Sequence, residues 1–247
     1  MGARAPTAVV PTTSLAFALP SGLTAHVRFT TATDGNFAVG QPADVLAARR
    51  QALVPMPWTW LHQVHGHRVV VVDEPGGQVG AYADAAVTSS PGAALAIQTA
   101  DCAPVALIAD EGVVAAVHVG WRGLVAGVVD GAVESVRRAG GTAVRAVIGP
   151  CIHACCYEFG AVDLDRVAAR YGDGVRATTR SGRSALDVPA AVTAALAAIP
   201  TAEVTRAGPG CTACDTPPMF SHRARGDSAR QAMVVWLERG VGESTLR

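Results

Sequence analysis

Lysine is absent from this 247-residue sequence, and all 20 of its cationic residues are arginines. The absence excludes a catalytic lysine that forms a Schiff base, and it excludes the lysine of a Walker A phosphate-binding loop. Long apolar runs are also missing, although 50% of the residues are hydrophobic. No stretch approaches the roughly 20 consecutive apolar residues that cross a bilayer as a helix, so we expect no membrane partner.

Neither sign of charge dominates, because 20 anionic residues balance the 20 arginines. The basic residues form no cluster larger than the pairs Arg49-Arg50 and Arg137-Arg138. A nucleic-acid partner would require a basic surface that neutralises phosphates, so we expect none. A small-molecule partner is expected instead, and no feature of the sequence specifies an oligomeric state.

Cysteine is sparse, with six residues in the whole chain. In a protein of this length they do not resemble the dense disulfide framework of a small secreted domain, which predicts a reduced, cytoplasmic protein. Cys211 and Cys214 have CxxC spacing, but no second pair stands at the spacing of a zinc finger. We therefore interpret these two residues, with Cys151, Cys155 and Cys156, as buried thiols.

The pattern of apolar residues predicts one mixed α/β domain over residues 1–247, with residues 1–22 irregular. Strands and helices do not alternate as in a Rossmann fold, so we expect layered sheets flanked by helices. Residues 172–184, rich in Gly, Thr and Arg, are expected to form an exposed loop. The predicted strands cover 23–31, 59–65, 68–73, 85–89, 94–99, 105–109, 113–117, 144–148 and 203–206, and the predicted helices cover 42–53, 124–138, 163–171, 188–199 and 228–238.

A tight hairpin is predicted where turn residues 110–112 separate two apolar β-type runs. If Val105 opposes Val117, then Cys102 and His118 lie diagonally on one face. Such a pair is roughly 7 to 8 Å apart at the backbone, which a metal with bonds of about 2.0 to 2.3 Å can bridge. Taken alone, however, the pair favours a buried Cys packed beside a hydrogen-bonded core His.

A third ligand for such a metal would come from the histidines His62, His65 and His67. In an extended strand His62 and His65 point to opposite faces, so both cannot serve one site unless the strand breaks. His65 is the better candidate because Gly66 follows it and allows close approach of the backbone, although this parity argument leaves His62 open.

Six motifs then occur in an order that resembles the laccase-domain purine nucleoside phosphorylase family, also called the polyphenol oxidase or peptidoglycan editing factor family. The resemblance runs from about residue 24 to the C-terminus, and six ordered motifs are far more specific than any one of them. The motifs are HQVHG (62–66), ADAAVTS (83–89), TADCAPV (99–105), AVHVGWRG (116–123), IGPCIHACCYEFG (148–160) and FSHRARGDSARQA (220–232).

The resemblance implies that His65, Cys102 and His118 are zinc ligands. Three protein ligands leave a fourth position for water or substrate. The resemblance also implies phosphorolysis of adenosine, inosine and methylthioadenosine, together with deamination of adenosine. Two departures from the family pattern concern substrate binding: the first Gly-rich loop is shortened to residues 30–40, and Arg225 stands at a usually acidic position.

Two arginines are candidates for binding substrate or phosphate. Arg122 precedes the helix expected near Leu124, where backbone N-H groups and a guanidinium together could hold an anion; a surface ion pair is the alternative. Arg223 is a second candidate, whereas Arg225 and Arg230 are expected to be solvated.

Two carboxylates are candidates for acid-base catalysis. Asp101 adjoins the proposed ligand Cys102 and could transfer a proton, or it could orient His118, which we favour. Glu158 is the second candidate, and a purely structural carboxylate is equally compatible with its position. Asp84 is expected to close a turn.

Three other functions compete with the nucleoside enzyme. A peptidoglycan-precursor editing hydrolase would use Cys102 as nucleophile and His118 as base. A copper-dependent polyphenol oxidase would need more histidines than the seven in this chain. A binding protein with a structural His/Cys metal site would have no turnover.

Overall fold

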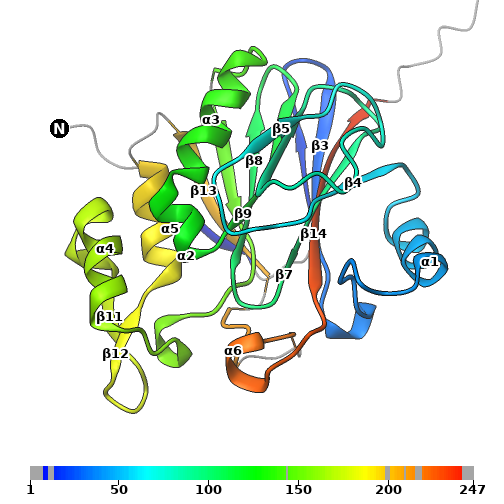
Figure 1. The fold of residues 1–247 in the computed structure, drawn as a ribbon. Coiled ribbons are helices and arrows are strands. Elements are labelled where there is room, and N and C mark those ends of the chain that lie inside the picture. The colour runs from blue at the N-terminus through cyan, green and yellow to red at the C-terminus, as the bar shows by residue number, and fades with distance from the viewer. Residues whose placement is uncertain are drawn as a thin grey trace, which may run out of the picture.

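Two mixed β-sheets form the centre of the protein in a computed structural model, which describes residues 8–10, 14–142, 144–197, 201–208, 210–214 and 219–240 (Figure 1). The seven-stranded sheet has the spatial order β1 (Ala8–Val10), β13 (Thr201–Ala207), β10 (Val144–Ile148), β8 (Ala103–Ala109), β9 (Val113–Val119), β6 (Ala85–Thr88) and β5 (Val69–Val71). The five-stranded sheet has the order β2 (Ser14–Ala18), β3 (Leu23–Phe29), β14 (Gln231–Arg239), β7 (Ala94–Thr99) and β4 (Trp58–Trp60).

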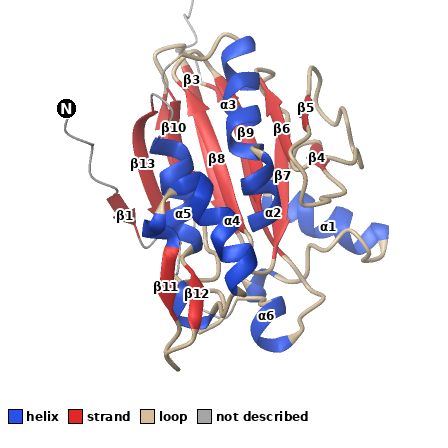
Figure 2. Cartoon of the chain, turned by 60° about the vertical axis from the view of Figure 1, so that its left-hand side comes forward, coloured by secondary structure: helices blue, strands red, loops and turns tan. Residues whose placement is uncertain are grey.

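Helices cover one face of the seven-stranded sheet. Helices α2 (Trp121–Ala126), α3 (Val128–Arg138) and α5 (Val188–Ala197) lie against the seven-stranded sheet, and α4 (Ala161–Tyr171) packs against α2 and α5 (Figure 2). Helix α1 (Ala43–Leu53) lies on the side of the five-stranded sheet, and α6 (His222–Arg225) is a single turn at the lower end of the molecule in Figure 1. A small hairpin of β11 (Arg176–Thr178) and β12 (Ser184–Leu186) lies beside α4.

The two sheets share one apolar layer. Ile97 of β7 and Met233 of β14 face Ile108 of β8 across it, and all three side chains are fully buried. On the opposite face of the larger sheet, Val105 and Leu107 of β8 pack beneath the helices. Because both faces of β8 and β9 are covered, every residue of these strands is buried, which explains their unbroken apolar sequence. The layered, mixed α/β fold predicted from the sequence is confirmed.

The predicted hairpin is also confirmed in its register. Val105 pairs with Val117, and Pro104 pairs with His118. Gly112 in the turn has a φ of 86°, a conformation that Gly adopts without steric penalty. Strand β8 begins at Ala103, so the thiol of the preceding Cys102 stands at the strand end. The hairpin therefore delivers Cys102 and His118 to the same edge of the sheet.

The helix predicted at 228–238 is wrong, because this segment contains strand β14. It is the middle strand of the five-stranded sheet, where Met233 pairs with Phe29 of β3 on one side and with Ile97 of β7 on the other. Both faces of the strand are buried through most of its length, so its apolar residues form a run without alternation. Such a run does not distinguish a buried strand from a buried helix.

Three smaller expectations also differ from the structure. The helix predicted at 124–138 begins earlier, at Trp121, and is divided by Gly127, whose φ is 91°. Segment 172–184, expected to be a loop, contains a 3-10 turn and β11. Segment 1–22, expected to be irregular, includes β1 and β2, and its residues 1–7 and 11–13 lie outside the described part. Residues 198 and 199, the end of the helix predicted at 188–199, also lie outside it.

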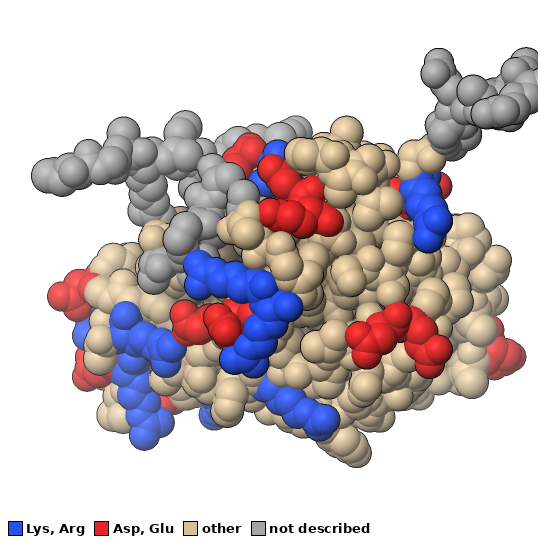
Figure 3. Space-filling model, turned by 90° about the horizontal axis from the view of Figure 1, so that it is seen from above, with Lys and Arg blue, Asp and Glu red and all other residues tan. Residues whose placement is uncertain are grey.

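On the face drawn in Figure 3, arginines and carboxylates are interspersed and separated by wide areas that carry neither. Within the described ranges, no helix combines the length and the apolar character needed to span a membrane.

Candidate metal centre and cavity

The side chains of His65, Cys102 and His118 converge at the edge where the hairpin ends. Their ligand atoms all lie within 4.8 Å of one another. The Cys102 Sγ is 3.7 Å from the His65 Nε2, and the two imidazole rings are 4.8 Å apart at their centroids. His118 is buried, Cys102 is half-buried and His65 is exposed, so the group opens to solvent on the side of His65.

Asp84 holds the side chain of His118 and the backbone of the His65 segment in place. It is fully buried at the start of β6, and its Oδ1 lies 2.8 Å from the Nδ1 of His118. The same carboxylate accepts backbone N-H groups from His65 at 2.9 Å and Gly66 at 2.7 Å. Burial alone would raise the pKa of Asp84, but the hydrogen bonds from His118, Gly66 and His65 outweigh it and lower the pKa. Asp84 was expected only to close a turn, and sequence reasoning therefore missed its role.

The backbone at His65 departs from an extended strand. His65 has a φ of 57°, in the left-handed region that non-glycine residues rarely adopt. The strand predicted at 59–65 accordingly ends at Trp60. His62 makes an isolated bridge with Tyr82 and stacks on its ring, and among the described residues it does not belong to the set whose ligand atoms converge. The break in the strand lets Val64, His65 and Gly66 turn their N-H groups towards Asp84.

Two glycines of the GWRG motif leave room for the His65 segment. A Cβ atom on Gly120 would lie 2.6 Å from the Cδ2 of His65 and 3.2 Å from the Sγ of Cys102. A Cβ on Gly123 would lie 2.7 Å from the carbonyl oxygen of Gly66. These contacts are far shorter than van der Waals distances, so the His65 segment can approach α2 only because both residues lack a side chain.

The charges of Cys102 and His118 are coupled. Burial would raise the pKa of the Cys102 thiol, but the charge of His118 and hydrogen bonds from His118 and His65 outweigh it and lower the pKa to about 6. Burial would lower the pKa of His118, but the thiolate and the Asp84 carboxylate raise it to about 9. Without a metal, the pair is therefore a thiolate and an imidazolium at neutral pH.

This pairing gives a testable pH dependence. In protein stripped of metal by a chelator, iodoacetamide should alkylate Cys102 with a half-maximal rate near pH 6, because the thiolate is the nucleophile. Above about pH 7 the rate should be constant. Peptide mass spectrometry would measure it, with Cys151 as internal control, since burial raises the pKa of that thiol. A rate that continues to rise through about pH 8.5 would show an ordinary thiol and contradict the pairing.

A cavity of about 660 Å³ opens above the three ligands. Two arginines predicted to bind substrate line it, each resting on an aromatic ring. The guanidinium of Arg122 lies 4.4 Å from the ring centroid of Trp121, and that of Arg223 lies 4.9 Å from the ring centroid of Tyr157. The volume falls in the usual range for small-molecule sites, about 300 to 1,000 Å³.

Asp101 lines the cavity, but its carboxylate has other partners than those expected. Its Oδ1 accepts the hydroxyl of Thr212 at 2.7 Å, and its Oδ2 accepts the backbone N-H of Arg223 at 2.6 Å. The expectation that Asp101 orients His118 is therefore wrong, because Asp84 occupies the Nδ1 of that ring. Asp101 instead fixes the position of Arg223.

Glu158 and Arg225 do not line the cavity. Glu158 is 53% exposed and forms an ion pair of 2.6 Å with Arg183. Arg225 is exposed, as expected, and it also pairs with Asp227 and donates to the carbonyl oxygens of Met219 and Thr212. Its guanidinium thus holds the chain around α6 in place.

The donor set of the three converging residues fits a metal ion. One thiolate and two imidazoles are ligands that zinc accepts readily, and copper sites use the same types. The Asp84 hydrogen bond occupies the Nδ1 of His118 and leaves its Nε2 free to bind, which is the usual arrangement for a metal-binding histidine.

These features define an α/β protein with a His-Cys-His cluster that could hold a metal ion, placed at a hairpin edge beside an open cavity. The chain belongs to the family described as multi-copper polyphenol oxidoreductase laccase, whose model matches residues 29–238. The family resemblance drawn from the six motifs is thereby confirmed.

Relatives and solved structures agree with this assignment. A protein of Mycobacterium tuberculosis (strain ATCC 25618 / H37Rv) named purine nucleoside phosphorylase is 37% identical over 219 residues, which cover 85% of this chain and 86% of the relative. A protein of Streptomyces griseus with the same name is 41% identical over 199 residues, covering 78% and 79%. YlmD from Geobacillus stearothermophilus superposes with a TM-score of 0.72 at 25% identity, covering 89% and 94%. Neisseria meningitidis protein NMB0706 shares the fold with a TM-score of 0.74 at 24% identity, covering 92% and 99%.

Proposed function

We propose that this protein is a zinc-dependent purine nucleoside enzyme that cleaves adenosine, inosine and methylthioadenosine with phosphate and also deaminates adenosine. One observation carries the proposal: the His65, Cys102 and His118 cluster and the arginines Arg122 and Arg223 line the same cavity. The names of the relatives point to the same substrate class.

Phosphorolysis requires a phosphate oxygen to bond to the ribose C1′ while the bond from C1′ to the purine nitrogen breaks and the leaving purine takes a proton. Arg122 and Arg223 supply two guanidinium groups that can bind phosphate oxygens in bidentate fashion. Each is held against an aromatic ring, so the positions of both groups are restricted before the anion arrives.

The remaining residues position these groups. Asp101 fixes the backbone of Arg223, and Asp84 fixes His118 and the His65 segment. Trp121 and Tyr157 offer apolar surface for the nucleoside within the same cavity. A zinc ion bound by His65, Cys102 and His118 would supply Lewis-acid chemistry beside the substrate.

Product analysis tests the proposal directly. Purified protein would be incubated with adenosine or inosine, with and without phosphate. Adenine or hypoxanthine together with ribose 1-phosphate, formed only with phosphate, would support phosphorolysis, and inosine formed from adenosine would support deamination. If neither set of products forms, the nucleoside function fails.

The phosphate-binding role predicts a defined effect of mutation. Arg122→Gln and Arg223→Gln should each raise the KM for phosphate by about tenfold or more, since a hydrogen bond to a charged group contributes about 1.5 to 3 kcal/mol. Glu158→Gln is the matched control, because its carboxylate pairs with Arg183 outside the cavity lining. Steady-state kinetics at varied phosphate would measure the effect, and equal KM values in all three variants would contradict the assignment.

One observation favours a second function, a hydrolase that edits peptidoglycan precursors. The pKa of Cys102, lowered to about 6 beside His118, is typical of a nucleophilic cysteine. The two functions differ in their need for metal: full activity of metal-free protein would exclude the zinc enzyme and favour the cysteine nucleophile. Metal analysis of the purified protein would also distinguish zinc from copper.

A further inference from the structure

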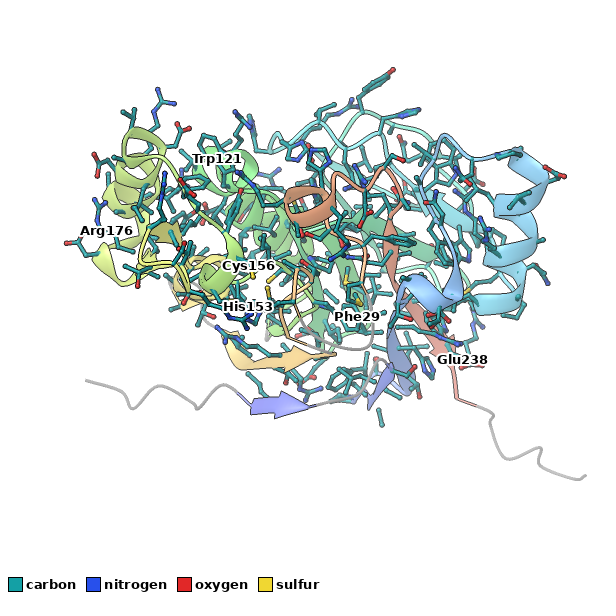
Figure 4. All side chains as sticks on the ribbon, turned by 90° about the horizontal axis from the view of Figure 1, so that it is seen from below. Phe29, Trp121, His153, Cys156, Arg176 and Glu238 are labelled. Carbon is teal, nitrogen blue, oxygen red and sulfur yellow. The ribbon has the colours of Figure 1, made fainter. Side chains whose placement is uncertain are left out.

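Four cysteines outside the cavity converge on a second point of the molecule. Cys155 and Cys156 lie in a 3-10 turn (Ala154–Cys156) after β10, whereas Cys211 and Cys214 lie in the turn after β13. Their Sγ atoms are all within 4.8 Å of one another. In Figure 4 sulfur atoms gather beside Cys156, and of the four cysteines only Cys211 is fully buried.

The spacing of these sulfurs matches a tetrahedral metal site. Zinc-thiolate bonds of about 2.3 Å place the corners of a tetrahedron about 3.8 Å apart. The Cys155 Sγ lies 3.7 Å from the Sγ of Cys156 and 3.7 Å from that of Cys214. We propose that Cys155, Cys156, Cys211 and Cys214 bind a second zinc ion as a closed, structural site.

Hydrogen-bond donors and a positive charge lie beside these four sulfurs, as a negatively charged zinc-thiolate site requires. Four thiolates around one Zn²⁺ carry a net charge of −2, which requires nearby donors. The guanidinium of Arg180 lies 3.3 Å from the Cys214 Sγ, and the backbone N-H of His153 donates to the Cys211 Sγ at 3.4 Å. The backbone N-H of Arg180 also donates to the carbonyl oxygen of Cys155, so the loop between β11 and β12 is docked against the cluster.

The second site would fix residues that line the catalytic cavity. Thr212 lies between two of the ligands, and its hydroxyl holds Asp101, the neighbour of Cys102. Tyr157 directly follows Cys156 and supports Arg223. A metal with four protein ligands leaves no position for substrate, so its function is to connect the two loops beneath the cavity.

The sequence alone does not indicate this arrangement, because the proposed ligands form a CC pair and a CxxC pair that are far apart in the chain. Strands β10 and β13 are parallel neighbours in the sheet, so the loops that follow them leave the same edge. Cys151 and Cys211 form an isolated bridge just beyond the strands, which brings the two loops together. The interpretation of these four residues as simple buried thiols is therefore replaced by a metal site.

Metal stoichiometry tests the proposal without reference to enzyme activity. Protein purified under reducing conditions should contain two zinc ions per chain by elemental analysis. Cys214→Ser and His65→Ala should each contain one, and the double variant none. Cys151→Ala is the matched control, since Cys151 is a buried thiol beside the cluster but outside the set of four, and it should retain both ions. One ion in wild type that disappears in His65→Ala would overturn the proposal.

A spectroscopic measurement covers the case in which Cys214→Ser fails to fold. His65→Ala protein loaded with Co²⁺ should show strong sulfur-to-cobalt charge-transfer bands and the visible bands of a tetrahedral site. Absence of these bands would overturn the proposal. So would a mass, measured under denaturing conditions without reductant, that is lower by two or four hydrogens, because the cysteines would then form disulfides.

Discussion

An Asp84→Ala variant should lose the metal centre and a large part of its stability. The buried carboxylate is the partner of the His118 Nδ1 and of the backbone N-H groups of His65 and Gly66. Loss of a residue that orients a metal ligand typically lowers metal affinity about 10- to 100-fold. Removal of one member of a buried charged pair typically lowers the free energy of unfolding by about 3 to 5 kcal/mol. Metal titration and chemical denaturation would measure the two effects.

A control variant at Asp130 distinguishes the specific effect of losing Asp84 from the general effect of losing a carboxylate. Asp130 forms an ion pair of 2.6 Å with Arg170 on the surface, and both side chains are more than two-fifths exposed. Asp130→Ala should change the free energy of unfolding by about 1 kcal/mol or less and leave the metal affinity unchanged. Equal behaviour of the two variants would contradict the role given to Asp84.

A single methyl group on Gly120 should displace the metal centre. The Cβ of Gly120→Ala would lie 2.6 Å from the His65 ring, so either the ring or helix α2 must move. A misplacement of about 1 Å in an active site can lower the rate about 100-fold. We therefore expect Gly120→Ala to bind less than one metal ion at the His65 centre and to lose most turnover. Gly123→Ala should have a similar effect through the carbonyl oxygen of Gly66.

Gly131→Ala is the control for these two glycine variants. Gly131 lies within helix α3, and a Cβ there would meet Val69 at 3.4 Å, an ordinary contact. Replacing a helical glycine by alanine typically raises stability by about 0.5 to 1 kcal/mol. We expect Gly131→Ala to melt at a slightly higher temperature with unchanged metal content. If Gly120→Ala also retained its metal, the packing argument would be wrong.

Local pattern predicted the hairpin and the convergence of Cys102 and His118, whereas the binding of a metal there stays a prediction. The two apolar runs and the turn between them fixed the register, and the register placed Cys102 and His118 on one face. Strand parity did not determine the position of His65, because the backbone leaves the extended conformation there, at a φ of 57°. The resemblance to the family motifs selected His65 from the sequence, and the structure brings it together with Cys102 and His118.

Long-range contacts account for what the sequence did not predict. Asp84 lies 34 residues from His118, and only the pairing of β6 with β9 brings the two together. A signal was present, since Asp84 is a charged residue at the start of an otherwise apolar strand within the ADAAVTS motif. Likewise, Asp101 meets Thr212 and Arg223 only through the packing of α6 and the turn after β13.

The position of β14 in the sheet has a consequence for biosynthesis. This strand lies between β3 and β7, and Met233 pairs with Phe29, about 200 residues earlier. At about 5 to 20 residues per second, a ribosome takes roughly 10 to 40 s to produce the middle strand after β3 has emerged. During that interval the nascent chain exposes two unpaired strand edges, which are templates for association between chains. Chaperone demand should therefore be greatest just before residues 231–239 leave the ribosome.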